Sequence, residues 1–502
     1  MRCVWLDAAV GGFHAFNEAH YTLVAKNFFQ GSFLLPTADG HDVFLETPPL
    51  YPYLLHAVFR VTGVSVVAGR LLSVASSLAL LLATFLLARR LFGEFAGLAA
   101  ALLVAATPVA VLTGRNIQTD ATLLALLVAG LFFYWRAEEG SQADRWRAGA
   151  FAGLALLTKL FALIAFAAVV LWELVTKRSL RWAAEKARWQ AAGLALLLPA
   201  LFYGYHALRD LGTLRREVAG GAAAATTFPR TGAEWTAIGS EVFWAFSPVI
   251  AILLLAAVAA ALWRPSRETL FALLPLSGFA FFYLFVHKHS YYLFTLLPFG
   301  AALAGRLLSR VRPRGLRLAV LVVVALSGVF WSLVDLTSMK LGFREFAEFG
   351  ERAAALPGAE HYLLIDREMR DSYAPVLRFY DPKAILATIE DMPADPDGRL
   401  RLHEKNQYFV KFVPAQAQPP PIGWLFSRAR YGLTLFGWTI AEAHANPHFF
   451  REGPYLAQKT GRPFDFRRGE LRVYPALALL PVPPDLALYR TRGGIEARAV
   501  ER

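Results

Sequence analysis

The chain has 502 residues, of which 56% are hydrophobic and 18% are charged, and its formal net charge is +13 at pH 7. An ordinary soluble domain is nearer half apolar and a quarter charged, so this composition excludes that class and indicates a membrane protein. The positive charge does not indicate nucleic-acid binding, because the basic residues lie in short loops between apolar stretches. The single cysteine, Cys3, excludes an intramolecular disulfide framework and a cysteine-ligated zinc site.

Residues 1–65 precede the first apolar span and contain two acidic motifs. Residues 15–30 are expected to form an amphipathic helix in the membrane interface, with Asn17 as N-cap and Glu18 in the first turn. Glu18 is then either a functional acid or a residue that merely favours the helix start. Glu46 lies before a rigid proline pair, and it is either a ligand for a metal or hydroxyl group or a solvated loop acid.

Stretches nearly free of charge and about 20 residues long, the length that a bilayer needs, recur along the chain. They cover residues 71–88, 95–113, 121–135, 191–208, 242–263, 270–286 and 316–334, with a shorter one at 291–305. Residues 148–176 are interpreted as two short helices that turn near Thr158 and Lys159. The sequence therefore predicts an α-helical polytopic membrane protein with about 10–11 transmembrane helices.

The loops between these spans predict the orientation. Alternate loops, around residues 89–90, 136–147, 177–188, 264–267 and 306–317, hold 17 Lys and Arg, and the intervening short loops hold six. The positive-inside rule places the first set in the cytoplasm. One long helix over residues 148–176, with a snorkelling or paired Lys159, is the alternative, but it would leave ten basic residues inside and 13 outside and abolish the bias.

With this topology, residues 1–65, the loops at 114–119, 209–240 and 287–290, and the chain after about residue 338 lie outside the cytoplasm. Residues 1–10 contain no apolar region long enough for a signal peptide. We therefore expect a first transmembrane helix to be missing upstream of residue 1.

Two outer loops carry compact groups of ionisable residues. Asp120 is either a functional acid beside Arg115 or simply the N-terminal acid of the next helix. His287, Lys288 and His289 are expected to bind a phosphate, since lysine is a good point-charge phosphate ligand; interfacial snorkelling is the alternative. No motif in the sequence requires a cofactor. The two histidines leave a divalent metal open as a cofactor, although their spacing is not that of metal ligands on a helix.

The C-terminal part, residues 338–502, differs from the preceding transmembrane domain over residues 1–337. Its charge and proline content are higher, and no window is long enough to span a membrane. Strands are predicted at residues 362–365 and 407–412, and helices around residues 343–355 and 374–379. The pattern indicates a small extracytoplasmic α/β domain without a phosphate loop, zinc signature or nucleophile elbow.

Five motifs, all in the predicted outer loops or in the hairpin, resemble those of the family 39 GT-C glycosyltransferases. Residues 17–21 (Asn-Glu-Ala-His-Tyr) resemble an Asp-Glu-x-x-Tyr signature, residues 46–50 a Glu/Lys-Pro-Pro-Leu element, and residues 115–120 an arginine-to-aspartate loop. Thr158 and Lys159 resemble a Thr-Lys-Gly turn, and residues 291–298 the start of a Tyr-x-x-Pro-Leu-x-Pro helix. The family includes protein O-mannosyltransferases and lipid A aminoarabinose transferases, and the resemblance covers residues 13–310.

The resemblance implies an inverting hexosyl- or pentosyltransferase of the cell envelope. Such an enzyme moves a sugar from a polyprenyl-phosphate donor to a lipid, glycan or protein acceptor on the periplasmic or extracellular side of the membrane. Glu18 and Asp120 are the carboxylates that would act as catalytic base. The residues implied or expected to bind substrate are Asn17, Tyr21, Glu46, Arg115, Lys159, His287, Lys288, His289 and Tyr292.

The sequence departs from the family pattern at three positions. Asn17 stands where an acid is usual, Thr47 where a lysine is common, and Phe161 follows Leu160 where glycine is usual after the lysine. A non-catalytic relative is therefore one alternative. A transporter or flippase of a lipid-linked sugar is the other, although it should show paired repeats and ionisable groups near the middle of the membrane.

Overall fold

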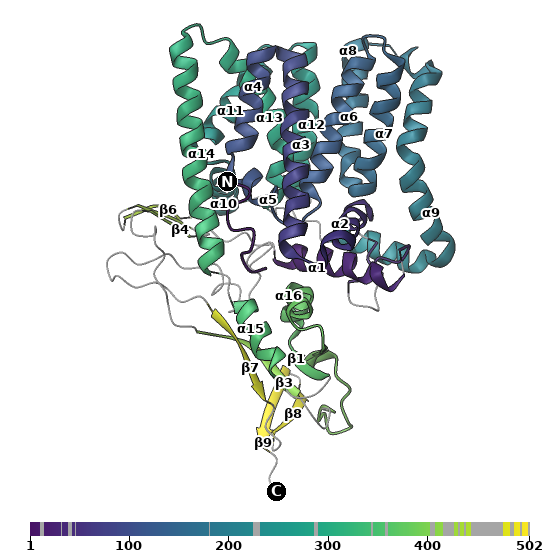
Figure 1. The fold of residues 1–502 in the computed structure, drawn as a ribbon, viewed down its shortest axis with the longest axis vertical. Helices are drawn as coiled ribbons and strands as arrows, with labels where there is room; N and C mark the ends of the chain where they lie inside the picture. Colours follow the sequence, from purple (N-terminus) through teal and green to yellow (C-terminus); the bar gives the residue numbers. More distant parts are fainter. Residues whose placement is uncertain are drawn as a thin grey trace.

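The computed structural model of the protein describes residues 1–10, 15–31, 33–38, 43–45, 47–179, 181–223, 231–285, 290–342, 345–356, 360–401, 407–414, 426–429, 432–435, 438–442, 475–481, 486–491 and 494–499. These residues form an upright helical bundle with a smaller α/β region beyond one of its ends (Figure 1).

The helices follow one another along the chain. Before the bundle lie α1 (Ala15–Asn27), η2 (Phe28–Gln30) and α2 (Leu50–Thr62). The bundle contains α3 (Val66–Phe92), α4 (Glu94–Ala106), α5 (Pro108–Thr113), α6 (Asp120–Ala137), α7 (Gln142–Thr158), η3 (Leu160–Ala162), α8 (Leu163–Lys177), η4 (Arg181–Ala184), α9 (Lys186–Ala223), α10 (Gly232–Phe246), α11 (Pro248–Trp263), α12 (Arg267–Phe285), η5 (Ser290–Leu296), α13 (Leu297–Ser309) and α14 (Arg314–Gly342).

The prediction of a polytopic helical membrane protein is confirmed. Seven helical segments of the described chain are long and apolar enough to cross a membrane: α3, α6, η3 with α8, α9, α12, η5 with α13, and α14. Two more, α4 and α11, are shorter apolar helices. Packed side by side, these segments form the bundle in Figure 1.

Two predicted spans are each divided by a proline. In the span at residues 95–113, α4 ends before Thr107, whose backbone is extended, and α5 starts at the following proline. The span at residues 242–263 breaks at Ser247, whose φ is 69° and ψ 151°, again before a proline. Proline clashes with a helical conformation of the residue before it, so each uninterrupted span predicted from hydropathy is wrong at this point.

The hairpin predicted within residues 148–176 is confirmed. Helix α7 ends at Thr158, the backbone of the following Lys159 is extended, and η3 and α8 then run in the opposite direction. At the far end of the hairpin, Lys177 at the end of α8 lies 2.5 Å from Glu138, just after α6. Close contact between the ends of α6 and α8 requires α7 and α8 to run in opposite directions.

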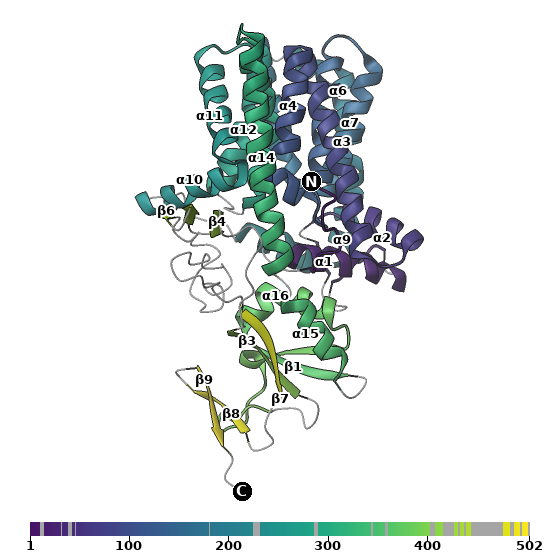
Figure 2. The same ribbon diagram turned by 60° about the vertical axis from the view of Figure 1, so that its left-hand side comes forward.

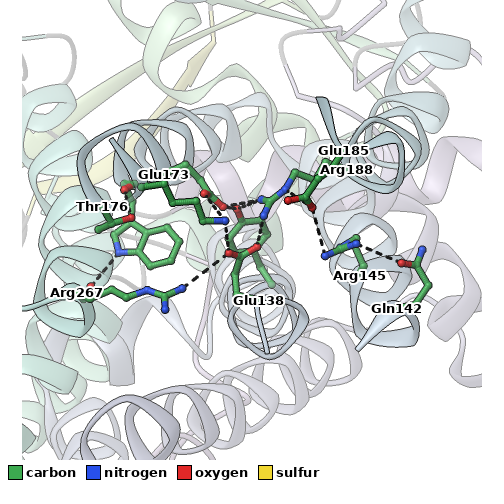
Figure 3. Close-up of polar contacts among 11 residues, drawn as sticks. Glu138, Gln142, Arg145, Glu173, Thr176, Glu185, Arg188 and Arg267 are labelled. Carbon is green, nitrogen blue, oxygen red and sulfur yellow. Dashed lines mark hydrogen bonds and ion pairs between the residues drawn. The ribbon is translucent and has the colours of Figure 1, made fainter. Parts of the chain in front are cut away.

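The five loops predicted to be basic meet at one end of the bundle. Arg188 of α9 forms a 2.6 Å ion pair with Glu173 of α8, and Arg267 at the start of α12 lies 3.8 Å from Glu138 (Figure 3). Elsewhere at this end, the guanidinium of Arg306 stacks on Phe92, and that of Arg317 stacks on Phe95. The alternation of loops derived from charge therefore matches the arrangement in space.

The hairpin packs closely against α9 through two glycines. A Cβ added to Gly149 would lie 2.6 Å from the carbonyl oxygen of Ala191, and one added to Gly153 would lie 3.0 Å from that of Ala195. Small residues four positions apart let two helix backbones approach in this way. This packing fixes the hairpin and, with it, the turn at Lys159.

Beyond the bundle the chain forms an α/β region. It consists of α15 (Glu345–Ala354), β1 (His361–Ile365), α16 (Arg367–Tyr380), β2 (Ala384–Thr388), η6 (Ile389–Asp391), β3 (Gln407–Pro414), β4 (Phe426–Ala429), β5 (Gly432–Leu435), β6 (Trp438–Glu442), β7 (Pro475–Pro481), β8 (Leu486–Thr491) and β9 (Gly494–Ala499). One sheet has the order β2-β1-β3-β7, with β1 parallel to β2 and β3, and β7 antiparallel to β3. The predicted strands and helices of this region are present, and the boundary predicted at residue 338, which falls within α14, stays a prediction.

Helix α1 lies between the bundle and the α/β region (Figure 2). Ala15 and Ala19 pack in a core with residues of α15, β1 and α16, and the hydroxyl of Tyr380 donates a 3.0 Å hydrogen bond to the carbonyl of Val10. The expectation of an amphipathic helix on the membrane surface is therefore wrong, because α1 is buried on opposite sides. Asn17 is not an N-cap, since the helix already starts at Ala15.

Candidate active site

The buried Asp120 and the partly exposed Lys159 form an ion pair at the end of the bundle that carries α1. Asp120 begins α6 and is fully buried, and its Oδ1 lies 3.3 Å from Nζ of Lys159. Its Oδ2 accepts a 2.7 Å hydrogen bond from Nε2 of Gln118. A buried charge is tolerated when it is paired, and here the pairing joins the first turn of α6 to the turn of the hairpin.

Aromatic rings surround the ammonium group of Lys159. Its Nζ lies 4.7 Å from the ring centre of Tyr292, 5.6 Å from that of Tyr291 and 5.7 Å from that of Phe161. Such rings attract a cation through their negative faces. Burial raises the pKa of the nearby Tyr21 phenol, although the charge of Lys159 acts in the opposite direction, so Tyr21 stays a hydrogen-bond donor at neutral pH.

A second ion pair joins α1 to α3. Arg70 binds Glu18 with two hydrogen bonds, of 2.9 Å from Nε to Oε1 and 2.7 Å from Nη2 to Oε2, and both side chains are at most 1% exposed. Arg70 also donates to the carbonyl oxygens of Leu6 and Ala8. Oε1 of Glu18 accepts a further 3.0 Å hydrogen bond from the backbone of Ile117. Both oxygens of this carboxylate are therefore engaged by protein groups.

Arg70 was absent from the predicted site, although the sequence holds a signal for it. It is a lone cation near the start of an apolar helix, and an ionisable residue in such a position usually has a partner and a role. The signal does not name the partner, since Glu18 is 52 positions away in the chain.

Arg115 lies on the same side of the site as Arg70. Its Nη2 donates a 2.5 Å hydrogen bond to the carbonyl of Trp5. Burial, and then the charge of Arg70, lower the pKa of Arg115 to about 10, so the guanidinium stays charged at neutral pH. The structure thus places the predicted residues Glu18 and Arg115 together, and Asp120 with Lys159, Tyr21 and Tyr292.

The loop that joins these two ion pairs contains buried polar atoms without partners. In the described part of the chain, Oδ1 and Nδ2 of Asn116, Nε of Arg115 and Oε1 of Gln118 have no hydrogen-bond partner. Native proteins pair most buried polar groups, so several unpaired groups within four consecutive residues distinguish this loop. Within residues 115–120 the sequence predicted only Arg115 and Asp120 as site residues, and not Asn116 or Gln118.

The other predicted residues are not part of this cluster as described. Asn17 is partly exposed and precedes Glu18 on α1, and consecutive residues of a helix point in different directions. Glu46, His287, Lys288 and His289 lie outside the described residues. Among the residues that are described, no group of three or more His, Cys, Asp and Glu side chains could hold a metal ion.

Comparison with known proteins relates this arrangement to a fold. The family model described as dolichyl-phosphate-mannose-protein mannosyltransferase matches residues 46–203. The structure of ArnT from Cupriavidus metallidurans bound to undecaprenyl phosphate aligns with 76% of this chain and 83% of its own, at a TM-score of 0.64 and 18% identity. The chain has the fold of the GT-C membrane glycosyltransferases. The resemblance predicted from the motifs is thereby confirmed.

The GT-C fold also relates the chain to a more distant enzyme. The oligosaccharyltransferase of Archaeoglobus fulgidus in its apo form aligns with 76% of this chain and 61% of its own, at a TM-score of 0.53 and 13% identity. Comparison with curated proteins gave no significant match.

Proposed function

We propose that this chain is an integral-membrane glycosyltransferase that moves a sugar from a polyprenyl-phosphate donor to an acceptor hydroxyl. The observation that carries the proposal is the ion pair of Asp120 and Lys159, in which Tyr291 and Tyr292 lie against the lysine, at one end of a GT-C bundle. The family model names a lipid-phosphate sugar donor, and the similar ArnT structure contains undecaprenyl phosphate. These comparisons support a donor of the same chemical class here.

The pair suggests how donor binding prepares the reaction. The phosphate of the donor is an anion and competes with Asp120 for the ammonium group of Lys159. Once Lys159 turns to the phosphate, Asp120 loses its counter-ion and becomes a better proton acceptor. Asp120 then takes the proton of the acceptor hydroxyl as the acceptor oxygen bonds to the anomeric carbon.

The leaving group departs as a lipid phosphate. The bond between the anomeric carbon and the phosphate oxygen breaks, and the bonding electrons stay on the phosphate, where Lys159 stabilises the added charge. One displacement of this kind inverts the anomeric configuration. Glu18 is bound on both oxygens by Arg70 and also accepts from the Ile117 amide, so in this scheme it positions the loop and Asp120 is the base.

The charge of the loops supports an active site on the extracytoplasmic side. Asp120 and Lys159 lie at the end of α6 opposite to Glu138, and Glu138 lies among the basic loops. The positive-inside rule assigns basic loops to the cytoplasm. We infer that the site faces the periplasm or the cell exterior.

Two measurements test the proposal. The first is mass analysis of the cell-envelope lipids, glycans and proteins after deletion of the gene and after complementation with the wild-type chain or Asp120→Asn. The second is transfer by the purified full chain in lipid nanodiscs, supplied with undecaprenyl-phosphate-linked sugars and an extract of envelope acceptors. We expect one glycosylated product to disappear on deletion, to return with the wild type only, and to form in nanodiscs.

A different outcome would identify the transporter alternative. If the purified chain moves the lipid-linked sugar across the bilayer of a vesicle and transfers no sugar to any acceptor, the enzyme proposal is wrong. The position of the ion pair speaks against this outcome, because Asp120 starts α6 and Lys159 follows the last residue of α7, whereas transporters bind substrate near the membrane midplane.

A further inference from the structure

Asn116 and Gln118 are two buried carboxamides in the loop that leads to the proposed base. Asn116 is fully buried and neither of its side-chain polar atoms has a partner in the described part of the chain. Gln118 is 1% exposed; its Nε2 donates to Asp120, while its Oε1 has no partner among the described residues. Leaving such groups unpaired opposes folding, so their retention calls for a compensating role.

The loop that carries them is held in place from two sides. The backbone of Ile117 donates to Glu18, and the Ile117 side chain is fully buried in a core with Tyr51 and Leu55. A Cβ added to Gly69 of α3 would lie only 2.7 Å from Cδ1 of Ile117, which shows how closely this side chain fits. With its central residue fixed in this way, the loop cannot easily move to pair the flanking carboxamides.

Carboxamides suit the recognition of hydroxyl groups. Each one offers a carbonyl oxygen that accepts and an NH₂ that donates, and a hydroxyl group also does both. In the proposed reaction the anomeric carbon lies between the phosphate near Lys159 and the acceptor oxygen near Asp120. The remaining hydroxyls of the same sugar ring must therefore lie close to these two residues, and Gln118 is already within hydrogen-bond distance of Asp120.

We propose that Asn116 and Gln118 form a subsite that binds hydroxyl groups of the transferred sugar and selects among sugars. This inference rests on the proposed function. Sites built to hydrogen-bond a hydroxyl discriminate strongly against ligands that lack it, because the buried groups then stay unpaired. The same unpaired state occurs when the donor lipid carries no sugar, so the subsite should distinguish the donor from the spent carrier.

The substitution Asn116→Leu tests the subsite, because leucine has nearly the same shape and no polar atom. The full chain in nanodiscs is titrated with undecaprenyl phosphate alone and with undecaprenyl phosphate carrying glucose, mannose, galactose or arabinose. We expect the wild type to bind at least one glycosylated lipid about tenfold or more tightly than the bare lipid. Asn116→Leu should remove this difference, leave the affinity for bare undecaprenyl phosphate unchanged, and leave the Tm equal or higher.

Gln142→Leu provides the matched control. Gln142 is an exposed carboxamide at the opposite end of the bundle, where it contacts Arg145 (Figure 3). The same chemical change at this position should preserve the preference for the glycosylated lipid. A rise in Tm with loss of the preference would be the opposite of what a merely structural asparagine produces.

Three results would overturn the subsite. They are an unchanged preference in Asn116→Leu, an equal loss of affinity for bare and glycosylated lipids together with a lower Tm, and a wild type that prefers no glycosylated lipid. Failure of the proposed function is seen separately. In that case the wild type transfers no sugar to any acceptor, while its preference for a glycosylated lipid is present and depends on Asn116.

Discussion

The two ends of the bundle both contain buried ionised groups, but they treat them differently. At the basic end, Glu138, Glu173, Lys177 and Arg188 each contact at least two charged partners (Figure 3). At the opposite end, Asp120 has a single ion pair among the described residues, and Asn116, four residues before it in the same loop, has no described partner for its polar atoms. A network of charged groups that neutralise one another rigidifies a structure, whereas carboxamide groups without partners remain available to a ligand. Under the proposed function, the first end contributes stability and the second end carries the chemistry.

The largest effect is expected from Asp120→Asn. An amide cannot take the acceptor proton, so transfer should fall by about 10²–10⁴-fold, measured as the initial rate of product formation. Asp144→Asn is the matched control, since Asp144 is also fully buried, also lies in the first turn of a helix and is ion-paired to Arg136 and Arg147 at the basic end. It should lower the Tm with little change in the rate; equal loss of rate in both variants would contradict the comparison.

Glu18→Gln is expected to act first on stability. Loss of one charge from a buried pair leaves Arg70 uncompensated, which typically costs roughly 3–5 kcal/mol. Unfolding of Glu18→Gln, Arg70→Met and the double variant gives the coupling between the two residues, which should be a large part of each single effect. Full stability of Glu18→Gln with a loss of transfer above about 100-fold would instead make Glu18 the base.

Glu173→Gln probes the basic end alone. Its carboxylate is 1% exposed and contacts Arg188 and Lys177, so we expect a loss of roughly 3 kcal/mol in unfolding free energy. The kcat and KM of the folded fraction should match the wild type, measured at a temperature well below the lowered Tm. A fall in kcat at constant folded fraction would show that the two ends are not separate.

The effect that is smallest at neutral pH concerns acid stability. Burial lowers the pKa of His20 from 6.5 to about 4, so this ring is neutral in the folded chain at pH values where it is protonated in the unfolded one. Its contribution to stability is complete above pH 6.5 and is lost as the pH falls toward 4, by up to roughly 3 kcal/mol.

His20→Phe should remove this dependence, because phenylalanine fits among the rings of Phe16 and Phe44 that surround His20. The measurement is the difference in unfolding free energy between the variant and the wild type at pH 7 and at pH 4.5. A difference that stays constant between the two pH values would contradict the assigned titration of His20.

The topology could be predicted because it depends on patterns along the chain. Charge alternation alone required the hairpin at Lys159, and the structure contains it. The prolines at residues 108 and 248 are present in the sequence. Hydropathy is averaged over a whole span, however, so it does not reveal that the helix is interrupted before each proline. The prediction for α1 was wrong because nothing in the sequence of that helix indicates that the C-terminal α/β region also packs against it.

The site could be predicted only as a set of residues. The sequence placed Asp120 and Lys159 in the same group without showing that they pair, since they are 39 positions apart. The partner of Glu18 was missed for the same reason. Whether the polar atoms of Asn116 find a partner depends on the residues packed around them. Periodicity and motifs in the sequence do not reveal such packing.

Helix α1 has a consequence for how this protein can be altered. Glu18 ties the helix to the bundle, while Ala15 and Ala19 lie in the core shared with α15, β1 and α16. Exchange of the C-terminal region for that of a relative would therefore need a matching apolar surface for these alanines. We expect chimaeras that lack it to lose the register of α1, so the two parts of the chain must be inherited and engineered as a unit.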